Sequence, residues 1–446
     1  MDQLMDLHEA LVTAITDIVR RWWSDVDRRF PQRMPLKAEE EELLKWLETQ
    51  VDCGNLADYS KRRGSWRPDF MVEELLDSGI QENFRITEIN ARFSFNSYLI
   101  AMNGQRALQD LRLKDYGLAS AACPDQILDG ICDLFNPKLP LYLLKGEEVA
   151  LDIVMLPFVL EKHYGIVPRI ISINSLRLVR DASHPLGHRL YHVETKSEHE
   201  NLGSADQMRS PKNGETLQEI HQLGLELRQH ELAALDPEML RQISLRCFND
   251  LRTILLVHDK RMLGIVKEEL EDLKQRGVIN DQQTRILDRG IADSVLPGSA
   301  SMKILLHDSE ARLDIKNDFL LKPIRGGKGV GILFGEDLSS DQWLTLLKDL
   351  QSPQIHDDAS YVIQRRIRPR LYDVLLKGEK IVQNPLVGTW QIVNGEYREL
   401  GGWRSSSSRV CAVSLGGAWI GSVISVDKDQ QVQLPLRLFP VHKSSF

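Results

Sequence analysis

The sequence predicts a fold of mixed helices and strands, of the α/β or α+β class, divided into roughly two to three domains. Three observations indicate this class. The chain has 446 residues, whereas a single globular domain usually has about 100 to 200. Its residues are 42% hydrophobic and 27% charged, as in ordinary folded proteins. Segments with helical periodicity alternate along the chain with short apolar runs that are typical of strands.

The first predicted unit covers residues 1–135 and begins with an amphipathic helix. Its apolar residues recur at helical spacing: Leu4, Leu7, Leu11, Ile15 and Ile18. The acidic run 39–42 is interpreted as the solvated face of another helix. Residues 84–90 alternate apolar and polar side chains, which indicates a strand. We expect further helices from there to residue 135.

The second predicted unit covers residues 136–250 and contains a βαβ arrangement. A strand, a helix and a second strand are expected at residues 141–144, 150–164 and 169–173. A further strand is expected at 176–179. Strands separated by a helix at this spacing are typical of a parallel sheet covered by helices.

The rest of the second unit is expected to be loop and helix. Residues 181–215 are polar and rich in His, Ser, Gly and Pro, which predicts a long loop. Residues 217–235 and 237–256 have helical periodicity, so each predicts a helix. The third unit, residues 251–446, alternates strands and helices with glycine turns between them.

Bulk properties exclude several classes of function. The formal net charge is -8, and no long Lys/Arg block is present, which argues against a nucleic-acid partner. The longest apolar run, 151–160, contains Asp152 and Pro157 and is far shorter than the ~20 residues of a membrane span. The five cysteines form no Cys-x-x-Cys pair. With no signal-peptide pattern at the start, we expect a cytoplasmic protein with free thiols; the oligomeric state stays open.

A glycine-rich segment at residues 319–334 predicts a phosphate-binding loop. An apolar strand ends at Lys322, a loop of glycines follows, and a second apolar strand begins at Val330. Lys328 adds positive charge within the loop. The glycines that would bring backbone N–H groups close to an anion are Gly326, Gly327 and Gly329. No helix follows, so this is neither a Walker A loop nor a Rossmann fingerprint; the alternative is a simple glycine hairpin.

The strand predicted at residues 360–367 ends in a polar pair, Gln364 and Arg365. A nucleobase needs apolar walls together with polar groups at one edge, and the end of such a strand supplies both. The segment is therefore a candidate for contacting the base of a nucleotide. Its alternative interpretation is an ordinary core strand.

Carboxylates far upstream predict a magnesium site. Glu88 and Asn90 are two residues apart on the expected strand, so their side chains share one face. Asp69 can join them from a neighbouring strand. Carboxylate and amide oxygens are ligands that Mg²⁺ accepts while it bridges phosphates. Arg67 or Arg92 could contact a phosphoryl group; the alternative is a polar strand face without a metal.

Together these segments resemble an ATP-grasp enzyme. Lys322 and its glycine loop resemble the second ATP-binding lysine of that family, and residues 257–263 resemble the segment with the first, here Lys260. Residues 361–365, which include Gln364 and Arg365, resemble the strand that contacts adenine. Glu88 and Asn90 resemble the magnesium-binding Glu-x-Asn pair.

The order of these motifs differs from the usual one. Glu-x-Asn normally follows the lysines, whereas here it precedes them, as in the circularly permuted ATP-grasp group that includes the glutathionylspermidine synthase type. Arg67-x-Asp69 is similar to the Arg-x-Asp of that group. Residues 401–404 resemble a paired-glycine segment, with Arg404 as a candidate phosphate contact.

The resemblance implies a circularly permuted ATP-grasp fold with N-terminal helices and a small βαβ unit like a pre-ATP-grasp domain. It implies ATP and Mg²⁺ as cofactors, held by the two lysines and by Asp69, Glu88 and Asn90. It further implies an ADP-forming ligase that joins a small carboxylic acid to an amine through an acyl phosphate, with Arg67 or Arg404 stabilising the oxyanion. The alternatives are an ATP-dependent phosphotransferase or a nucleotide-binding protein without catalysis. The identity of the acid and of the amine is not indicated.

Overall fold

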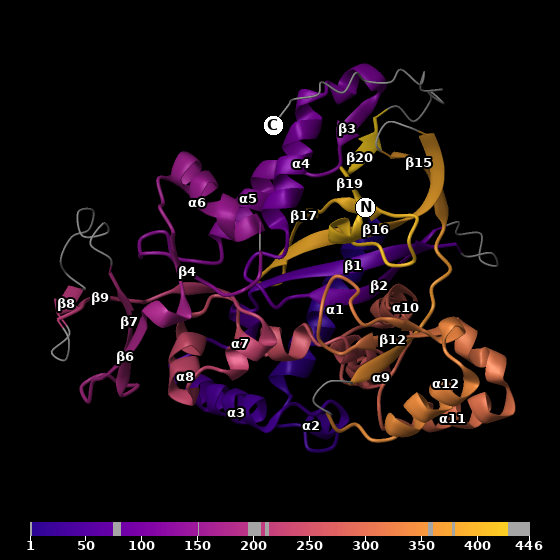
Figure 1. Ribbon diagram of the computed structural model, residues 1–446, viewed down its shortest axis with the longest axis horizontal. Helices are drawn as coiled ribbons and strands as arrows, with labels where there is room; N and C mark the ends of the chain where they lie inside the picture. The colour runs from indigo at the N-terminus through magenta and orange to yellow at the C-terminus, as the bar shows by residue number, and fades with distance from the viewer. Residues whose placement is uncertain are drawn as a thin grey trace.

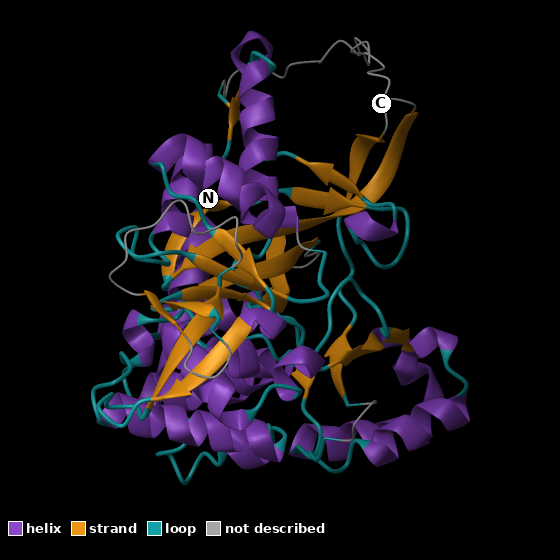
Figure 2. Ribbon diagram, turned by 60° about the vertical axis from the view of Figure 1, so that its left-hand side comes forward, coloured by secondary structure: helices purple, strands orange, loops and turns teal. Residues whose placement is uncertain are grey.

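The fold combines helices and strands throughout the molecule, as the sequence predicts. The computed structural model describes residues 2–74, 82–149, 151–194, 207–209, 214–355, 360–376 and 380–426. Within these ranges the strands form five sheets. Figure 1 shows their arrangement, and Figure 2 shows helices and strands mixed along the whole molecule, without an all-helical or an all-strand half.

The largest sheet joins strands from both ends of the chain. Its order is β19-β18-β16-β1-β2, and β15 and β17 also pair with β16. All of its pairs are antiparallel. Its strands are β1 (Ser65–Glu73), β2 (Asn83–Asn90), β15 (Leu371–Leu376), β16 (Lys380–Val393), β17 (Glu396–Leu400), β18 (Trp403–Ser405) and β19 (Ala418–Ile420). The predicted strand at 84–90 is thus confirmed, and it lies two strands from the C-terminal β16.

An aromatic cluster packs on this sheet around Phe70 of β1. Its ring centroid lies 5.0 Å from that of Phe84, 5.5 Å from that of Trp390 and 5.2 Å from that of Trp403. Gly388 of β16 faces the cluster, and a Cβ there would lie 2.3 Å from the Phe70 ring. Only glycine allows this close approach of the backbone to the ring. The cluster therefore fixes β1 between its two neighbours.

The predicted βαβ unit is confirmed by a parallel sheet of order β10-β4-β5. It comprises β4 (Tyr142–Lys145), α6 (Leu151–Tyr164), β5 (Arg169–Ile171) and β10 (Leu223–Glu226). An antiparallel sheet follows it, with strands β6 (Leu176–Arg180), β7 (His188–Val193), β9 (Thr216–Glu219) and β8 (Gln207–Arg209). The strand expected at 176–179 is β6.

Two predictions in this region are wrong. The expected loop 181–215 contains β7 and β8, while residues 195–206 and 210–213 lie outside the described residues. The expected helix 217–235 consists of β9, β10 and the short α7 (Gln229–Ala233). All four residues of β10 are buried, and a strand buried on both faces does not alternate apolar and polar residues. Without that alternation, the spacing of the leucines in β10 was taken for the period of a helix.

A four-stranded sheet of order β11-β14-β12-β13 carries the glycine loop. Its strands are β11 (Ser294–Val295), β12 (Phe319–Pro323), β13 (Leu333–Phe334) and β14 (Tyr361–Arg365). Helices α11 (Ala300–Ala311) and α12 (Ser340–Asp349) pack together, and Trp343 of α12 is fully buried in the core they share with β12. The antiparallel pair β12–β13 confirms the predicted strand–loop–strand arrangement, with the second strand beginning at Leu333 rather than at Val330.

The remaining helices surround these sheets. They are α1 (Asp2–Arg20), α2 (Phe30–Arg33), α3 (Ala38–Asp52), α4 (Tyr98–Asp110), α5 (Pro124–Cys132), α8 (Pro237–Arg246), α9 (Arg261–Gln275) and α10 (Asp281–Gly290). A small pair, β3 (Leu118–Ser120) with β20 (Val423–Ser425), interrupts the helices expected up to residue 135. The helix expected at 237–256 ends at Arg246, because Cys247 bridges to Leu223 of β10; a π-helix then covers Thr253–Val257.

All five cysteines are free. In the described part of the chain, no helix combines the length and the apolarity that crossing a membrane requires.

We expect Phe70→Ala to destabilise the fold by about 3–5 kcal/mol, because truncating a fully buried phenylalanine removes its contacts and leaves a cavity. Urea unfolding followed by circular dichroism measures this change. Phe158 of α6 is the matched control, since it is 69% exposed, and Phe158→Ala should change the free energy of unfolding by less than about 0.5 kcal/mol. Equal effects of the two changes would contradict a core centred on Phe70.

Candidate active site

The predicted metal ligands meet where β1 pairs with β2. Asp69 lies opposite Glu88, and Arg67 lies opposite Asn90. A register shift after Asp69 interrupts the ladder at this point, and such irregularities re-aim side chains. The Asn90 amide donates to Glu88 Oε1 over 3.4 Å. Two carboxylates and one amide therefore converge on one patch, as their spacing predicts.

Two arginines hold Asp69 in place. Arg67 Nε donates to Asp69 Oδ1 at 2.9 Å, and Arg67 Nη1 also donates to Ser97 Oγ at 2.8 Å. Arg404 comes from β18 and forms an ion pair with the second oxygen of Asp69. Burial alone would lower the pKa of Arg404, but the Asp69 carboxylate raises it above its ordinary value. The structure thus brings both predicted catalytic arginines to the carboxylate patch.

Both predicted ATP-binding lysines reach the same patch from the C-terminal half. Lys260 Nζ lies 3.6 Å from Glu88 Oε2 and donates to the carbonyl of Gly326 at 2.7 Å. Lys322 Nζ donates to the backbone carbonyl of Thr87, the neighbour of Glu88, at 3.2 Å. Segments more than 170 residues apart in sequence therefore form one cluster.

The charges of this cluster shift one another's pKa values. Burial alone would raise the pKa of Glu88, but Lys260, Lys322 and the two arginines hold it below its usual range. Burial lowers the pKa of Lys322 to about 8, against the opposing effect of Glu88. Four cationic side chains thus face two carboxylates, and the excess positive charge favours an anionic ligand. The four are Arg67, Lys260, Lys322 and Arg404.

The glycine loop has the backbone shape that only glycine adopts easily. Gly326, Gly329 and Gly331 have φ of 140°, 72° and 79°, in the region that side chains disfavour. A Cβ on Gly326 or Gly327 would meet nothing within 4 Å, so the start of the loop is open. Lys328 Nζ pairs with Glu148 Oε1 at 2.8 Å, which places this lysine on the βαβ side.

The two residues predicted to contact a base point in different directions. Gln364 is buried, and its amide donates to the carbonyl of Thr87 at 3.2 Å, the same carbonyl that Lys322 contacts. Arg365 is exposed, because successive side chains of a strand point to opposite faces. Gln364 therefore belongs to the cluster, and the Arg365 side chain points away from it.

The guanidinium of Arg92, which the sequence offered as a phosphoryl contact, lies over the Phe93 ring at 4.7 Å from the ring centroid.

His258 is a neighbour of the cluster that the sequence pattern did not single out. It is buried, and its Nδ1 lies 3.2 Å from the carbonyl of Ile89, between Glu88 and Asn90. Burial and the nearby Arg92 and Lys260 charges lower its pKa to about 3. It is therefore a neutral side chain beside the carboxylates. The sequence signal that could have indicated His258 is its position directly before Asp259 and Lys260.

The residues present fit a magnesium ion. Among the described residues, no three His, Cys, Asp or Glu side chains gather as a metal cluster. Mg²⁺ does not need such a cluster, because it is commonly bound by one or two carboxylates together with phosphates and water. Asp69 and Glu88 would supply the carboxylates, and the two lysines that face Glu88 would hold the phosphates.

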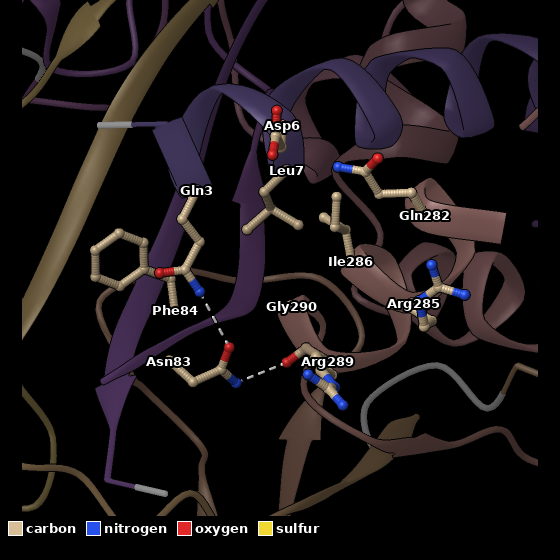
Figure 3. Close-up of a pocket in the computed structure, with 10 residues that line it drawn as sticks. All are labelled: Gln3, Asp6, Leu7, Asn83, Phe84, Gln282, Arg285, Ile286, Arg289 and Gly290. Atoms are coloured by element: carbon tan, nitrogen blue, oxygen red, sulfur yellow. Dashed lines mark hydrogen bonds between the residues drawn. The ribbon is translucent and has the colours of Figure 1, made fainter. Parts of the chain in front are cut away.

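Two cavities lie outside this cluster. One of about 300 Å³ lies between α1, the start of β2 and α10, with Asn83 donating to the carbonyl of Arg289 at 2.9 Å in its wall (Figure 3). The other has about 570 Å³ and lies between α3, α7 and α8. Neither is lined by Glu88, Lys260 or Lys322, so neither is the predicted site.

The sequence is similar to that of a known enzyme along most of its length. The family model of the AnkG N-terminal domain matches residues 7–256. The ATP-grasp enzyme ankG of Aspergillus thermomutatus is 34% identical over 428 residues, which are 95% of this chain and 86% of that protein. A solved glutathione synthetase-like effector from Globodera pallida is 11% identical with a TM-score of 0.49, over 94% of this chain and 86% of its own. The family match and the identity to ankG show that the chain belongs to the AnkG family of ATP-grasp enzymes.

Proposed function

We propose that this protein is an ADP-forming carboxylate–amine ligase that makes an amide bond through an acyl phosphate. The observation that carries the proposal is the convergence of the acidic patch of β1 and β2 with both lysines and Arg404. An enzyme that activates a carboxylate with ATP needs positive charge for the phosphates and hard oxygen ligands for Mg²⁺ in one place. The relation to ankG supports ATP as the nucleotide.

Circular permutation of the ATP-grasp fold is part of the proposal. The Glu-x-Asn strand β2 precedes both lysines in the chain, and β1 joins it to the C-terminal β16 in one sheet. These two features support a permuted order. We further propose the division into units 1–135, 136–250 and 251–446, in which the first and third together build the site and the second, with its βαβ sheet, faces the substrates.

In the proposed reaction each side chain has a distinct task. Asp69, Glu88 and Asn90 would hold Mg²⁺, which neutralises phosphate charge when it is bound. Lys260 and Lys322 would bind the phosphates, with residues 326–331 covering them. The carboxylate of the acid attacks the γ-phosphorus in line, ADP leaves, and the amine then attacks the acyl carbon of the acyl phosphate, releasing phosphate.

The arginines would act on the acyl group rather than on the nucleotide. Arg67 and Arg404 both contact Asp69, so their guanidinium groups are fixed before a substrate arrives. A positive group that is already oriented stabilises a developing oxyanion at little reorganisation cost. Excluding water protects the acyl phosphate from hydrolysis, and the glycine loop is the element that could do so by closing.

The reaction itself distinguishes a ligase from a phosphotransferase. We expect ADP release to require an acid and an amine together, and mass spectrometry of the product to show an amide with loss of water. Panels of small carboxylic acids and amines, offered singly and in pairs, provide the assay. A phosphorylated product made from one substrate alone would contradict the ligase proposal.

We expect Glu88→Gln to lower the turnover number by at least about 100-fold, because a metal and its charge contribute several kcal/mol to such a transition state. Glutamine has the same size and shape as glutamate, so the fold should be preserved. Glu161→Gln on the exposed end of α6 is the control and should leave turnover unchanged. Steady-state ADP release at saturating Mg²⁺ is the measurement, and near-normal turnover of the Glu88 variant would exclude the metal role.

The affinity for Mg-ATP should fall as the pH rises through about 8. Lys322, whose pKa is lowered to about 8, is charged below that pH and attracts phosphate, whereas above it the free protein carries a neutral amine. Calorimetric titrations between about pH 7 and 9.5 should show this step. Lys322→Arg should remove the step, and Lys322→Ala should bind weakly at every pH. Lys303→Ala, an exposed change in α11, should behave like the wild type; a step that persists without Lys322 would refute the assignment.

A further inference from the structure

Glu40 corrects the interpretation of the acidic run 39–42 as a solvated face. Glu39 and Glu42 are exposed, but Glu40 is buried. It accepts the N–H of Lys37 at 3.1 Å in the capping box that begins α3. Its two oxygens also accept from the two terminal nitrogens of Arg325 at 2.7 and 2.8 Å. This bidentate pair fixes both the position and the orientation of the guanidinium.

Arg325 extends the contact to a second buried pair. Its Nε lies 3.5 Å from Asp259 Oδ2, and the same oxygen pairs with Arg261 Nη2 at 2.8 Å. Arg261 Nη2 in turn donates to the carbonyl of Pro35 at 3.0 Å, just before α3. The four charged groups therefore form a chain that starts in α3 and returns to the segment just before that helix. We call Glu40, Arg325, Asp259 and Arg261 the buried ion network.

The residues of the buried ion network are sequence neighbours of Lys260 and of the start of the glycine loop. Lys260 lies between Asp259 and Arg261 in sequence, and Arg325 directly precedes Gly326. The backbone N–H of Lys260 donates to the carbonyl of Ile324 at 3.0 Å, and its amine donates to that of Gly326. The segment of Lys260 and the start of the glycine loop are thus held by these two hydrogen bonds and by the ion pairs of the neighbouring residues.

Each charged group of the buried ion network lies beside a group of opposite charge. Burial alone would lower the pKa of Arg325, but Glu40 and Asp259 raise it. Burial alone would raise the pKa of Asp259, but Arg261 and Arg325 lower it. Arg325 and Asp259 therefore stay charged at neutral pH. A buried ion pair adds little net stability compared with apolar side chains of the same size. We therefore interpret the network as a device that fixes the positions of its residues.

We propose that Glu40, Arg325 and Asp259 are positioning residues that hold Lys260 and the start of the glycine loop in the arrangement that receives the nucleotide phosphates. They act through their neighbours and do not touch the nucleotide. The inference rests on the proposed function for the role of Lys260, but the holding of the loop is measurable without a nucleotide. The proposal makes the first turn of α3, far away in sequence, a part of the ATP site.

The test compares two glutamate changes on one helix. Glu40→Gln keeps the capping box, because a glutamine at this position also accepts the N–H of Lys37. It removes the negative charge that faces Arg325 and one of the two oxygens that accept from Arg325 and from the Gln229 amide. Glu42→Gln makes the same chemical change at an exposed position of α3. Two measurements follow: amide hydrogen exchange of residues 257–263 and 324–331 without nucleotide, and the dissociation constant of Mg-ATP by calorimetry.

Glu40→Gln should speed exchange in these two segments and weaken Mg-ATP binding, each by about tenfold, and exchange in α1 and β1 should stay as in the wild type. Glu42→Gln should change neither. Arg325→Met should match Glu40→Gln, Arg325→Lys should recover part of the loss because it keeps the charge, and the double variant should lose less than the product of the single effects.

The outcomes that would overturn the proposal are separate from those that concern the proposed function. Unchanged exchange and affinity in Glu40→Gln would show that the network does not hold the loop. A uniform rise of exchange over the whole chain would show a role in global stability only. Wild-type protein that fails to bind Mg-ATP would refute the proposed function, and the exchange measurement would still decide whether the network orders the loop.

Discussion

The pairing of β1 with β2 on one side and with β16 on the other is the constraint on which the candidate site depends. It puts Asp69 opposite both Glu88 and Thr389, so the carboxylates of the N-terminal part lie beside the C-terminal strands. Through β18 the same sheet delivers Arg404 to Asp69. The aromatic packing around Phe70 keeps this order, because it fills the space beside β1 with rings from β2, β16 and β18.

The electrostatics of the site follow from this pairing. Carboxylates and cations in a largely buried place are costly alone and tolerable together. The arginines pair with Asp69 in fixed geometry, whereas the more flexible lysines face Glu88 and backbone carbonyls. Guanidinium groups suit rigid carboxylate pairs, and ammonium groups suit ligands whose oxygens move during a reaction. The lysines are therefore the groups best able to exchange a protein partner for phosphate oxygens.

Much of the site could be predicted because its signals are local. Glu88 and Asn90 share a face at a spacing of two, and Lys322 lies four residues before Gly326. Lys260 and Arg404 were indicated by the family resemblance. The strands β9 and β10 were mistaken for helix because a fully buried strand lacks the alternating pattern. Glu40 was mistaken for a solvated residue because its partner, Arg325, is 285 positions away. Pairings at such distances leave no periodicity, and only the folded chain shows them.

The glycine loop is held at its start and in its middle by contacts with different consequences. At its start, Arg325 and Gly326 are held by the buried ion network and by Lys260. In its middle, Lys328 reaches Glu148 just after β4, and this pairing, against the effect of burial, lowers the pKa of Glu148. Lys328 is 55% exposed in its side chain, so this contact is the weaker one. In the proposed reaction, a loop that is fixed at its base and held in its middle by an exposed ion pair would close over the ligand while Lys260 and Lys322 stay in place, with its glycines changing φ and ψ.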